Sequence, residues 1–306
     1  MDLEWFLKGV LWMSERLDRL EAISIQILRE AYSEYSNLCM LWSIGKDSTV
    51  LLYLAQKAFF GHIPFPLVHI DTHFKIPEMI KYRDELTKKW HLNMIYGENA
   101  EAISAKKTFL DGNVSRIECC RLLKTEALNK VLSGEGVRYK YNHEKEMYEK
   151  DQDNTPYNGV ILGIRADEEG SRSKERYFSA RDNKNTWSVD KQPPEFWNQY
   201  KTDFKPGTHV RIHPLLDWTE LDIWEYIKQE NIPTVSLYYN NGSGKRYRSL
   251  GCYCCTSPIN SSSSNVDEII EELKSGMLKN IAERARREQD KDDCGGLETL
   301  RREGYM

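Results

Sequence analysis

The chain has 306 residues, a net charge of −4 at pH 7, 40% hydrophobic residues and 29% charged residues. This length and composition fit one large globular domain or a domain with an appendage, and the negative charge excludes general attraction to nucleic acid. Charges interrupt the N-terminal segment too often for a signal peptide or a membrane span, so we expect a cytoplasmic protein. The seven cysteines would then be reduced, which favours metal binding or catalysis over disulfides.

The first predicted element is an amphipathic helix in an N-terminal leader, residues 1–35. Its apolar residues recur at helical spacing and form one stripe. The stripe consists of Leu17, Leu20, Ile23, Ile27, Leu28 and Ala31. Such a stripe either packs against the rest of the chain or joins two copies of it, and the second outcome would give a homo-oligomer.

Residues 36–235 alternate between predicted strands and predicted helices. The expected strands are 37–42, 66–71, 92–97, 159–165 and 209–215, and the expected helices are 77–90, 118–132 and 220–231. Alternation of this kind implies parallel βαβ units. The predicted fold class is therefore α/β, with a doubly wound, mostly parallel sheet.

Two further segments complete the expected organisation. Residues 139–158 are highly charged and lack an apolar period, so we expect an exposed insertion, with a mobile lid as one use for it. Residues 236–306 form a C-terminal extension of helix and loop that carries several cysteines.

A short polar turn follows the first strand, in the stretch MLWSIGKDSTVLL. A strand, a small turn and a helix make a cradle for an anion, because backbone N–H groups and the helix start point at it. Gly45 permits a positive φ or a close approach, Ser43 and Ser48 offer hydroxyls, and Lys46 offers a charge. The Walker A spacing is absent. The alternative is an ordinary turn capped by Asp47 or Ser48.

The S-x-G-x-D-S pattern of this turn resembles the pyrophosphate loop of N-type ATP pyrophosphatases, the adenine nucleotide alpha-hydrolase-like superfamily. Those enzymes usually carry S-G-G-K-D-S, and Ile44 in place of the first glycine resembles the small subunit of bacterial sulfate adenylyltransferase. The resemblance implies that ATP, with Mg²⁺, is split between its α and β phosphates and that AMP goes to an acceptor. It implies ATP-binding roles for Ser43, Gly45, Lys46, Asp47 and Ser48, with Lys46 and Asp47 also catalytic.

Three other polar residues belong to the same resemblance. Asp71 follows the second strand, at the end where ligands bind in open α/β sheets. Arg165 directly follows the fourth strand in LGIRADEEGSRSKER, and Arg172 lies further along the same segment. Both guanidinium groups would neutralise phosphate or a sulfur oxyanion, and Arg165 would also act in catalysis. The alternative is a solvated run of charges.

The cysteines depart from a plain sulfate adenylyltransferase subunit. Cys119 and Cys120 open a predicted helix, and Cys252 and Cys255 form a C-x-x-C with Cys254 inside it. Together, the pair and the C-x-x-C supply four thiolates, the number that a [4Fe–4S] cluster needs, and zinc is the alternative. The arrangement resembles assimilatory adenylylsulfate reductases and the ATP pyrophosphatase of bacterial DNA phosphorothioation systems.

Cys294 stands apart, in DDCGGLE. It resembles the C-terminal E-C-G segment of the reductases, whose cysteine attacks a sulfonyl group, and this resemblance implies a catalytic role. The neighbouring aspartates disfavour a low thiol pKa. The alternative is a tail residue without a role.

These features predict an ATP pyrophosphatase that activates an acceptor for sulfur incorporation, with DNA backbone phosphorothioation as the first interpretation. The expected partners are a cysteine desulfurase or another sulfur donor, and a further subunit of the modification system. DNA would be presented by a partner or held by a basic loop at Lys245, Arg246 and Arg248. The alternatives are a sulfate adenylyltransferase small subunit with a GTPase partner, an adenylylsulfate reductase, and a non-catalytic nucleotide-binding scaffold.

Overall fold

The computed structural model describes residues 3–182, 186–188, 192–195, 199–204, 209–279 and 281–288. Its centre is an eight-stranded sheet with the order β5-β4-β3-β2-β1-β6-β8-β7. The strands are β1 (Leu38–Leu41), β2 (Leu67–Ile70), β3 (Met94–Gly97), β4 (Arg138–Asn142), β5 (Met147–Lys150), β6 (Gly159–Ile161), β7 (Phe178–Arg181) and β8 (His209–Ile212). Five neighbouring strands of this sheet pair in parallel, in the order β3-β2-β1-β6-β8. This arrangement confirms the predicted fold class.

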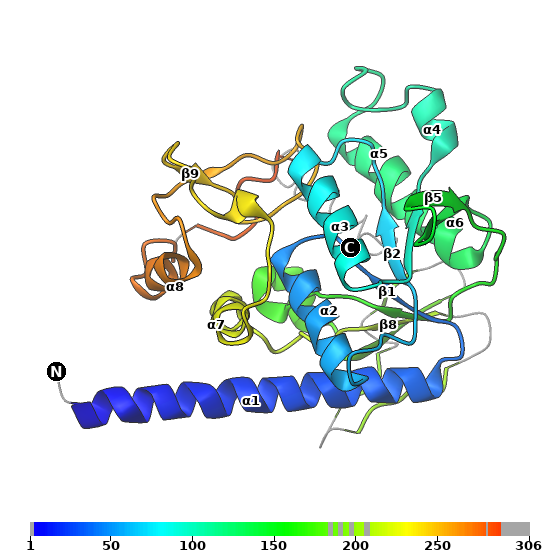
Figure 1. The fold of residues 1–306 in the computed structure, drawn as a ribbon. Helices are drawn as coiled ribbons and strands as arrows, with labels where there is room; N and C mark the ends of the chain where they lie inside the picture. The colour runs from blue at the N-terminus through cyan, green and yellow to red at the C-terminus, as the bar shows by residue number, and fades with distance from the viewer. Residues whose placement is uncertain are drawn as a thin grey trace.

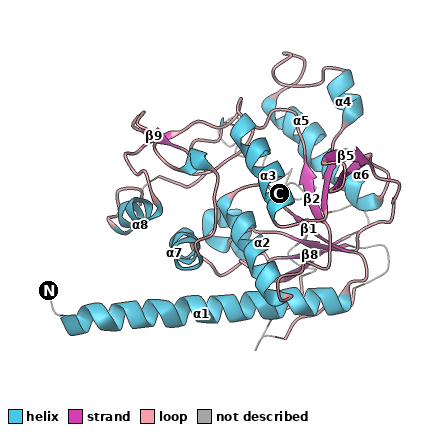
Figure 2. Cartoon of the chain, viewed as in Figure 1, coloured by secondary structure: helices cyan, strands magenta, loops and turns pink. Residues whose placement is uncertain are grey.

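Helices lie around this sheet, and Figure 2 separates them from the strands by colour. They are α1 (Leu3–Glu34), α2 (Lys46–Ala58), α3 (Pro77–Lys89), α4 (Ala100–Ser104), α5 (Arg116–Cys120), α6 (Ala127–Ser133), α7 (Glu220–Glu230) and α8 (Val266–Lys274). Short turns of 3₁₀ helix occur at η2 (Ala166–Glu168), η3 (Gly170–Lys174) and η5 (Ser236–Tyr238). A small antiparallel pair, β9 (Lys245–Arg246) and β10 (Ile259–Asn260), lies in the C-terminal extension.

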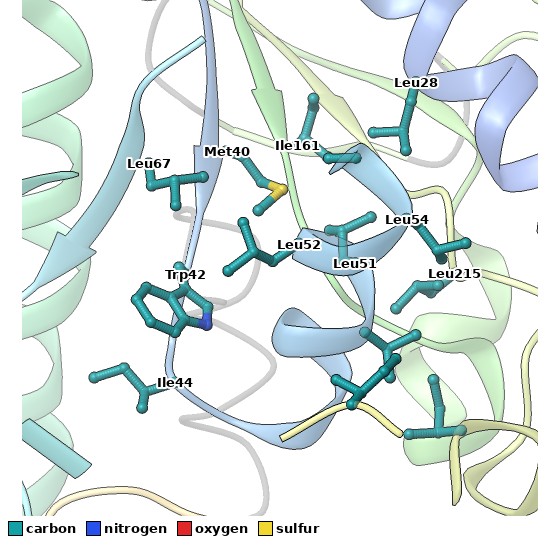
Figure 3. Close-up of a cluster of buried hydrophobic side chains, with 14 of the residues drawn as sticks. Leu28, Met40, Trp42, Ile44, Leu51, Leu52, Leu54, Leu67, Ile161 and Leu215 are labelled. Atoms are coloured by element: carbon teal, nitrogen blue, oxygen red, sulfur yellow. The ribbon is translucent and has the colours of Figure 1, made fainter. Parts of the chain in front are cut away.

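The core forms where α2 packs on the sheet. Every residue of β1 and β2 is buried, as expected for central parallel strands with both faces covered. Figure 3 shows Leu51 and Leu52 of α2 beside Met40 and Trp42, which lie on and just after β1. This packing fixes the start of α2 directly beyond the end of β1.

The predicted leader helix packs against the same core. Five of the six residues in its apolar stripe are buried, and α1 contacts α2 along its C-terminal half (Figure 1). The stripe therefore serves packing within the chain. In the described part of the chain, no helix is both long and apolar enough to cross a membrane.

Residues 138–150, which cover the first part of the charged insertion at 139–158, form a β-hairpin and not a mobile lid. Strands β4 and β5 extend the sheet edge in antiparallel register. The reason is aromatic pairing across strands: Tyr139 stacks on Tyr96 at 4.7 Å between ring centroids, and Tyr141 packs on Tyr148 at 5.1 Å. Exposed charged residues such as Lys140 and Lys150 lie between and beside these tyrosines, so the alternation of the tyrosines is hard to recognise in the sequence.

The single helix predicted over 118–132 is divided into three parts. Helix α5 ends at Cys120, a π-helical segment η1 (Arg121–Glu126) follows, and α6 completes the run. π-Helical segments occur frequently at functional sites. This one begins immediately after the predicted cysteine pair.

Candidate functional site

The polar turn after β1 leaves the start of α2 open. Gly45 is the N-cap residue, with φ −76° and ψ 164°, and no side chain caps the helix there. The left-handed residue is Ile44, at φ 68°, so the expected positive φ belongs to Ile44 and not to Gly45. The Tyr238 hydroxyl accepts from the Lys46 N–H, and the uncapped N-terminus keeps its other N–H groups available to an anion.

A cavity of about 130 Å³ opens at this helix start. It lies at the carboxyl ends of β1 and β6, where the strand order reverses, which is the usual ligand position in an open α/β sheet. Six of the predicted binding residues line it: Ser43, Gly45, Lys46, Asp47, Ser48 and Arg172. The structure therefore brings together most of the predicted ATP-binding set.

Three buried charges and the partly exposed carboxylate of Asp47 form the floor of the site. Lys46 Nζ is paired with the Glu283 carboxylate and lies 3.4 Å from Asp47 Oδ2. Arg165 pairs with Asp47 and donates from Nη2 to Glu283 Oε2 at 2.5 Å. The side chains of Lys46 and Arg165 are 1% and 0% exposed, so each depends on these partners for its charge.

These contacts set the protonation of the cluster. Burial alone would lower the pKa of Lys46 and of Arg165, but Asp47 and Glu283 outweigh it and both pKa values rise. Burial raises the pKa of Glu283, yet Arg165 and Lys46 outweigh it and the net shift is downward. Two cations and an ionised Glu283 therefore meet below the cavity at neutral pH.

Two predicted residues do not face the cavity directly. Arg165 is absent from the described residues that line it, because its guanidinium lies behind the carboxylates of Asp47 and Glu283. Asp71 is also absent from that lining, and it accepts a hydrogen bond from the backbone N–H of His73 at 2.8 Å. A ligand-binding role for Asp71 remains a prediction.

The basic loop does not form the predicted nucleic-acid grip. Arg246 is 1% exposed and donates to Glu272 at 2.7 Å, and Arg248 donates to Glu220 at 2.6 Å. Buried carboxylates on α8 and α7 thus neutralise both guanidinium groups. Lys245 is the exposed member of the three.

The predicted cysteines gather beside the cavity. Cys252 and Cys255 each act electrostatically on both Cys119 and Cys120, so the C-x-x-C loop lies near the cysteine pair. The pair closes α5 and does not open a helix as the sequence predicted. Cys254 Sγ lies 3.6 Å from Cys255 Sγ. Cys294, the remaining predicted cysteine, lies outside the described residues.

Two lysines connect the thiols to the cavity. Lys124 lines the cavity and donates to Cys120 Sγ at 3.5 Å, and Lys75 lines it and forms an isolated β-bridge with Cys252. Burial raises the pKa of Cys252, but Lys124 and Lys75 outweigh it and the net shift is downward. Mainly because of its hydrogen bond with Cys254, the pKa of Cys255 falls to about 6. Positive charge therefore favours a thiolate at Cys252, whereas burial raises the pKa of Cys119 to about 11 and also raises that of Cys120.

The thiols fit the chemistry of a metal site but not the geometry of one. Four thiolates suit a [4Fe–4S] cluster or zinc by donor type. Among the described residues, however, no group of three or more His, Cys, Asp or Glu side chains is placed to hold a metal ion. The metal-binding roles of Cys119, Cys120, Cys252 and Cys255 therefore remain predictions.

Comparison with known proteins decides the family. Residues 37–258 match the model of the phosphoadenosine phosphosulfate reductase domain. The chain belongs to the phosphoadenosine phosphosulfate reductase family. Among its relatives, a protein named sulfate adenylyltransferase subunit 2 from Shewanella amazonensis is 39% identical over 95% of this chain and 97% of its own length. A protein of the same name from Pseudoalteromonas translucida is 37% identical over 95% and 98%.

A solved structure agrees with the fold. Candida glabrata FMN adenylyltransferase is 16% identical, covers 90% of this chain and 88% of its own, and aligns with a TM-score of 0.53. At this identity the likeness concerns the fold alone. The chain described here and the Candida glabrata enzyme thus share an open α/β sheet although their sequences differ.

Sequence reasoning missed several residues of the site. Glu283 and Tyr238 line the cavity, and the Tyr238 hydroxyl accepts from the backbone N–H of Lys46 at 2.8 Å. Gly163 also lines it, and a Cβ there would lie 3.0 Å from Ser48 Cα. Its position after a strand, in GVILGIR, was the available signal for this close approach.

We expect the Glu168 carboxylate, beside the cavity, to make stability depend on pH. Burial raises its pKa, but Arg172 and Arg284 outweigh this and lower the pKa from 4.5 to about 2. Its contribution is therefore complete above about pH 4.5 and is lost as the pH falls toward 2. Glu168→Gln should cost about 3 kcal/mol in the free energy of unfolding at pH 7.

Urea unfolding at several pH values checks this prediction. The difference between wild type and Glu168→Gln should shrink between pH 4.5 and 2, whereas the exposed Glu15→Gln control should change little at pH 7. A difference for Glu168→Gln that stays constant with pH would contradict the assignment.

Proposed function

We propose that this chain is an ATP-dependent adenylyl-transferring enzyme that acts on sulfate as the catalytic subunit of a sulfate adenylyltransferase. The observation that carries the proposal is the uncapped start of α2, with Lys46, Asp47 and Ser48 lining a cavity at the reversal of the strand order. The relatives of that name, which match along nearly the whole chain, support sulfate as the acceptor. A GTPase subunit is the partner that this assignment implies.

The residues divide the reaction into recognisable tasks. A sulfate oxygen attacks the α-phosphorus of ATP, the bond from that phosphorus to the bridging oxygen breaks, and pyrophosphate leaves with the electron pair. The N–H groups at the start of α2 and the hydroxyls of Ser43 and Ser48 would hold the pyrophosphate. Lys46 and Arg165 supply positive charge where negative charge develops. Arg172, also on the cavity, would bind the oxyanion.

Magnesium fits this site as a companion of the nucleotide. Mg²⁺ is usually bound by one or two carboxylates together with substrate phosphates and water, and it neutralises a departing pyrophosphate. Asp47 places a carboxylate on the cavity wall and would contact the ion. Among the described residues, the chain offers no preformed group of three such ligands.

A second candidate function is adenylation coupled to sulfur incorporation, as in DNA phosphorothioation. The observation that favours it is the gathering of thiols next to the cavity, joined to it by Lys75 and Lys124. In this reaction AMP activates an acceptor phosphate, and a sulfur nucleophile then displaces AMP. A cysteine desulfurase or another sulfur donor would be needed, together with a partner that presents DNA.

Lys46→Ala should reduce pyrophosphate release by a factor of about 100 or more, because a charge directed at the reacting phosphates is lost. The assay follows pyrophosphate from ATP and sulfate in the presence of the GTPase partner and GTP. Lys57→Ala, on the same helix but paired with Glu21 and Glu230, is the matched control and should keep its activity. Circular dichroism verifies that both variants fold, and unchanged turnover of folded Lys46→Ala would refute its role.

Cysteine variants separate the two candidate functions. If the chain makes adenylylsulfate, Cys120→Ser and Cys255→Ser should keep most of that activity, because no thiol takes part in the transfer. If it incorporates sulfur, both changes should abolish sulfur transfer while ATP binding persists. Iron and sulfide analysis of anaerobically purified protein accompanies the assay, with the exposed-strand variant Lys245→Ala as a control. Loss of adenylylsulfate synthesis in both cysteine variants would count against the first candidate.

A further inference from the structure

The C-terminal strap, which we define as residues 281–288, closes one side of the cavity. Its Glu283, Arg284 and Arg287 belong to the cavity lining. Glu283 is 6% exposed at its side chain, and its two oxygens engage Lys46 and Arg165 separately. The Glu283 carboxylate is thus paired with Lys46 and Arg165, the two cations that would bind phosphate in the proposed reaction.

The cavity is too small for a whole nucleotide while the strap stays in place. It measures about 130 Å³, whereas pockets for small molecules are typically 300–1,000 Å³. The opposite walls are the start of α2 and the ends of β1 and β6, which belong to the packed core. The strap is outside the main sheet and is attached through ion pairs, an isolated bridge and a few hydrogen bonds to residues 248–257, so it is the wall that can move.

The charges of the cluster lead to the same conclusion. Asp47 and Glu283 balance Lys46 and Arg165, so neither of these two cations is left uncompensated for an incoming triphosphate. The surplus positive charge of the lining lies elsewhere, on Lys75, Lys124 and Arg287. Removing a partner from a buried ion is costly unless another anion replaces it at once. A phosphate oxygen is such a replacement, and exchange of one anion for the other keeps the two cations paired.

We propose that Glu283 is an autoinhibitory gate, which holds Lys46 and Arg165 until the phosphates of the nucleotide displace it and open the strap. The inference rests on the proposed nucleotide site and adds a closed state to it. Part of the binding free energy of the nucleotide is spent on displacing Glu283, so the apparent affinity is lower than that of an open site.

The strap also connects the gate to the thiols. The backbone N–H of Glu288 donates to the carbonyl of Cys255 at 3.0 Å, and that of Ser257 donates to the carbonyl of Arg286 at 3.1 Å. Arg287 forms a β-bridge with Thr256. Displacement of Glu283 therefore loosens the loop that carries the C-x-x-C, and the nucleotide site and the cysteines become energetically coupled.

Glu283→Gln tests the gate by calorimetric titration of the full-length chain with ATP in EDTA and again with MgATP. Loss of the competing charge should tighten ATP binding by a factor on the order of ten under both conditions. Glu271→Gln, an exposed carboxylate on α8 with the same change in net charge, is the matched control and should bind like wild type.

Each contrary result has a distinct meaning. Unchanged or weaker binding by Glu283→Gln, while wild type binds ATP, overturns the gate and leaves the nucleotide site standing. Weaker binding with MgATP alone identifies Glu283 as a ligand of the metal and also overturns the gate. If wild type binds no ATP, both the proposed site and the gate are refuted.

A measurement on the wild-type chain decides the case if Glu283→Gln does not fold. The strap contains Arg284, Arg286 and Arg287, which are trypsin sites. Release of the strap should make cleavage at these residues several-fold faster when ATP is present in EDTA. Equal or slower cleavage at saturating ATP would overturn the gate.

Discussion

The buried cluster of Lys46, Asp47, Arg165 and Glu283 determines the arrangement of the site. Both cations lie almost wholly out of water, and a buried ion is stable only when its partner is held in place. The partners come from the start of α2, the segment after β6 and the C-terminal strap. The pairing therefore joins three parts of the chain at the point where an anion can bind.

The sheet makes that meeting possible. Because β1 and β6 are parallel neighbours, the segments that follow them emerge at the same edge. Gly163 then passes within 3.0 Å of Ser48 Cα, measured from where a Cβ would be, so the two segments are nearly in contact. Packing of Leu51 and Leu52 beneath α2 holds the helix start rigid enough to serve as a binding surface.

Local patterns in the sequence predicted the parts that depend on neighbouring residues. The alternation of strands and helices indicated the parallel sheet, and the small polar turn indicated an anion cradle. Glu283 escaped notice because it lies 237 residues from Lys46, and no local pattern connects them. The hairpin at β4 and β5 also escaped, since the alternating tyrosines are masked by charges. The paired states of Arg246 and Arg248 likewise depend on distant carboxylates.

Family membership accounts for the proposed nucleotide site of this chain but not for its cysteines. Membership and the names of the relatives favour adenylyl transfer to sulfate. The thiols beside the cavity are an additional feature: lysines on its wall lower the pKa of Cys252, whereas burial raises the pKa values of Cys119 and Cys120. The cavity and the thiols lie next to each other in this fold, and this placement does not depend on the acceptor.

Amide hydrogen exchange of the full-length chain, with and without ATP, tests most directly whether the charge cluster is the nucleotide site. The account predicts slower exchange at residues 43–49 and 162–166 when ATP is saturating, because bound phosphates order the start of α2 and the segment after β6. Protection confined to another part of the chain, with these two segments unchanged, would contradict it.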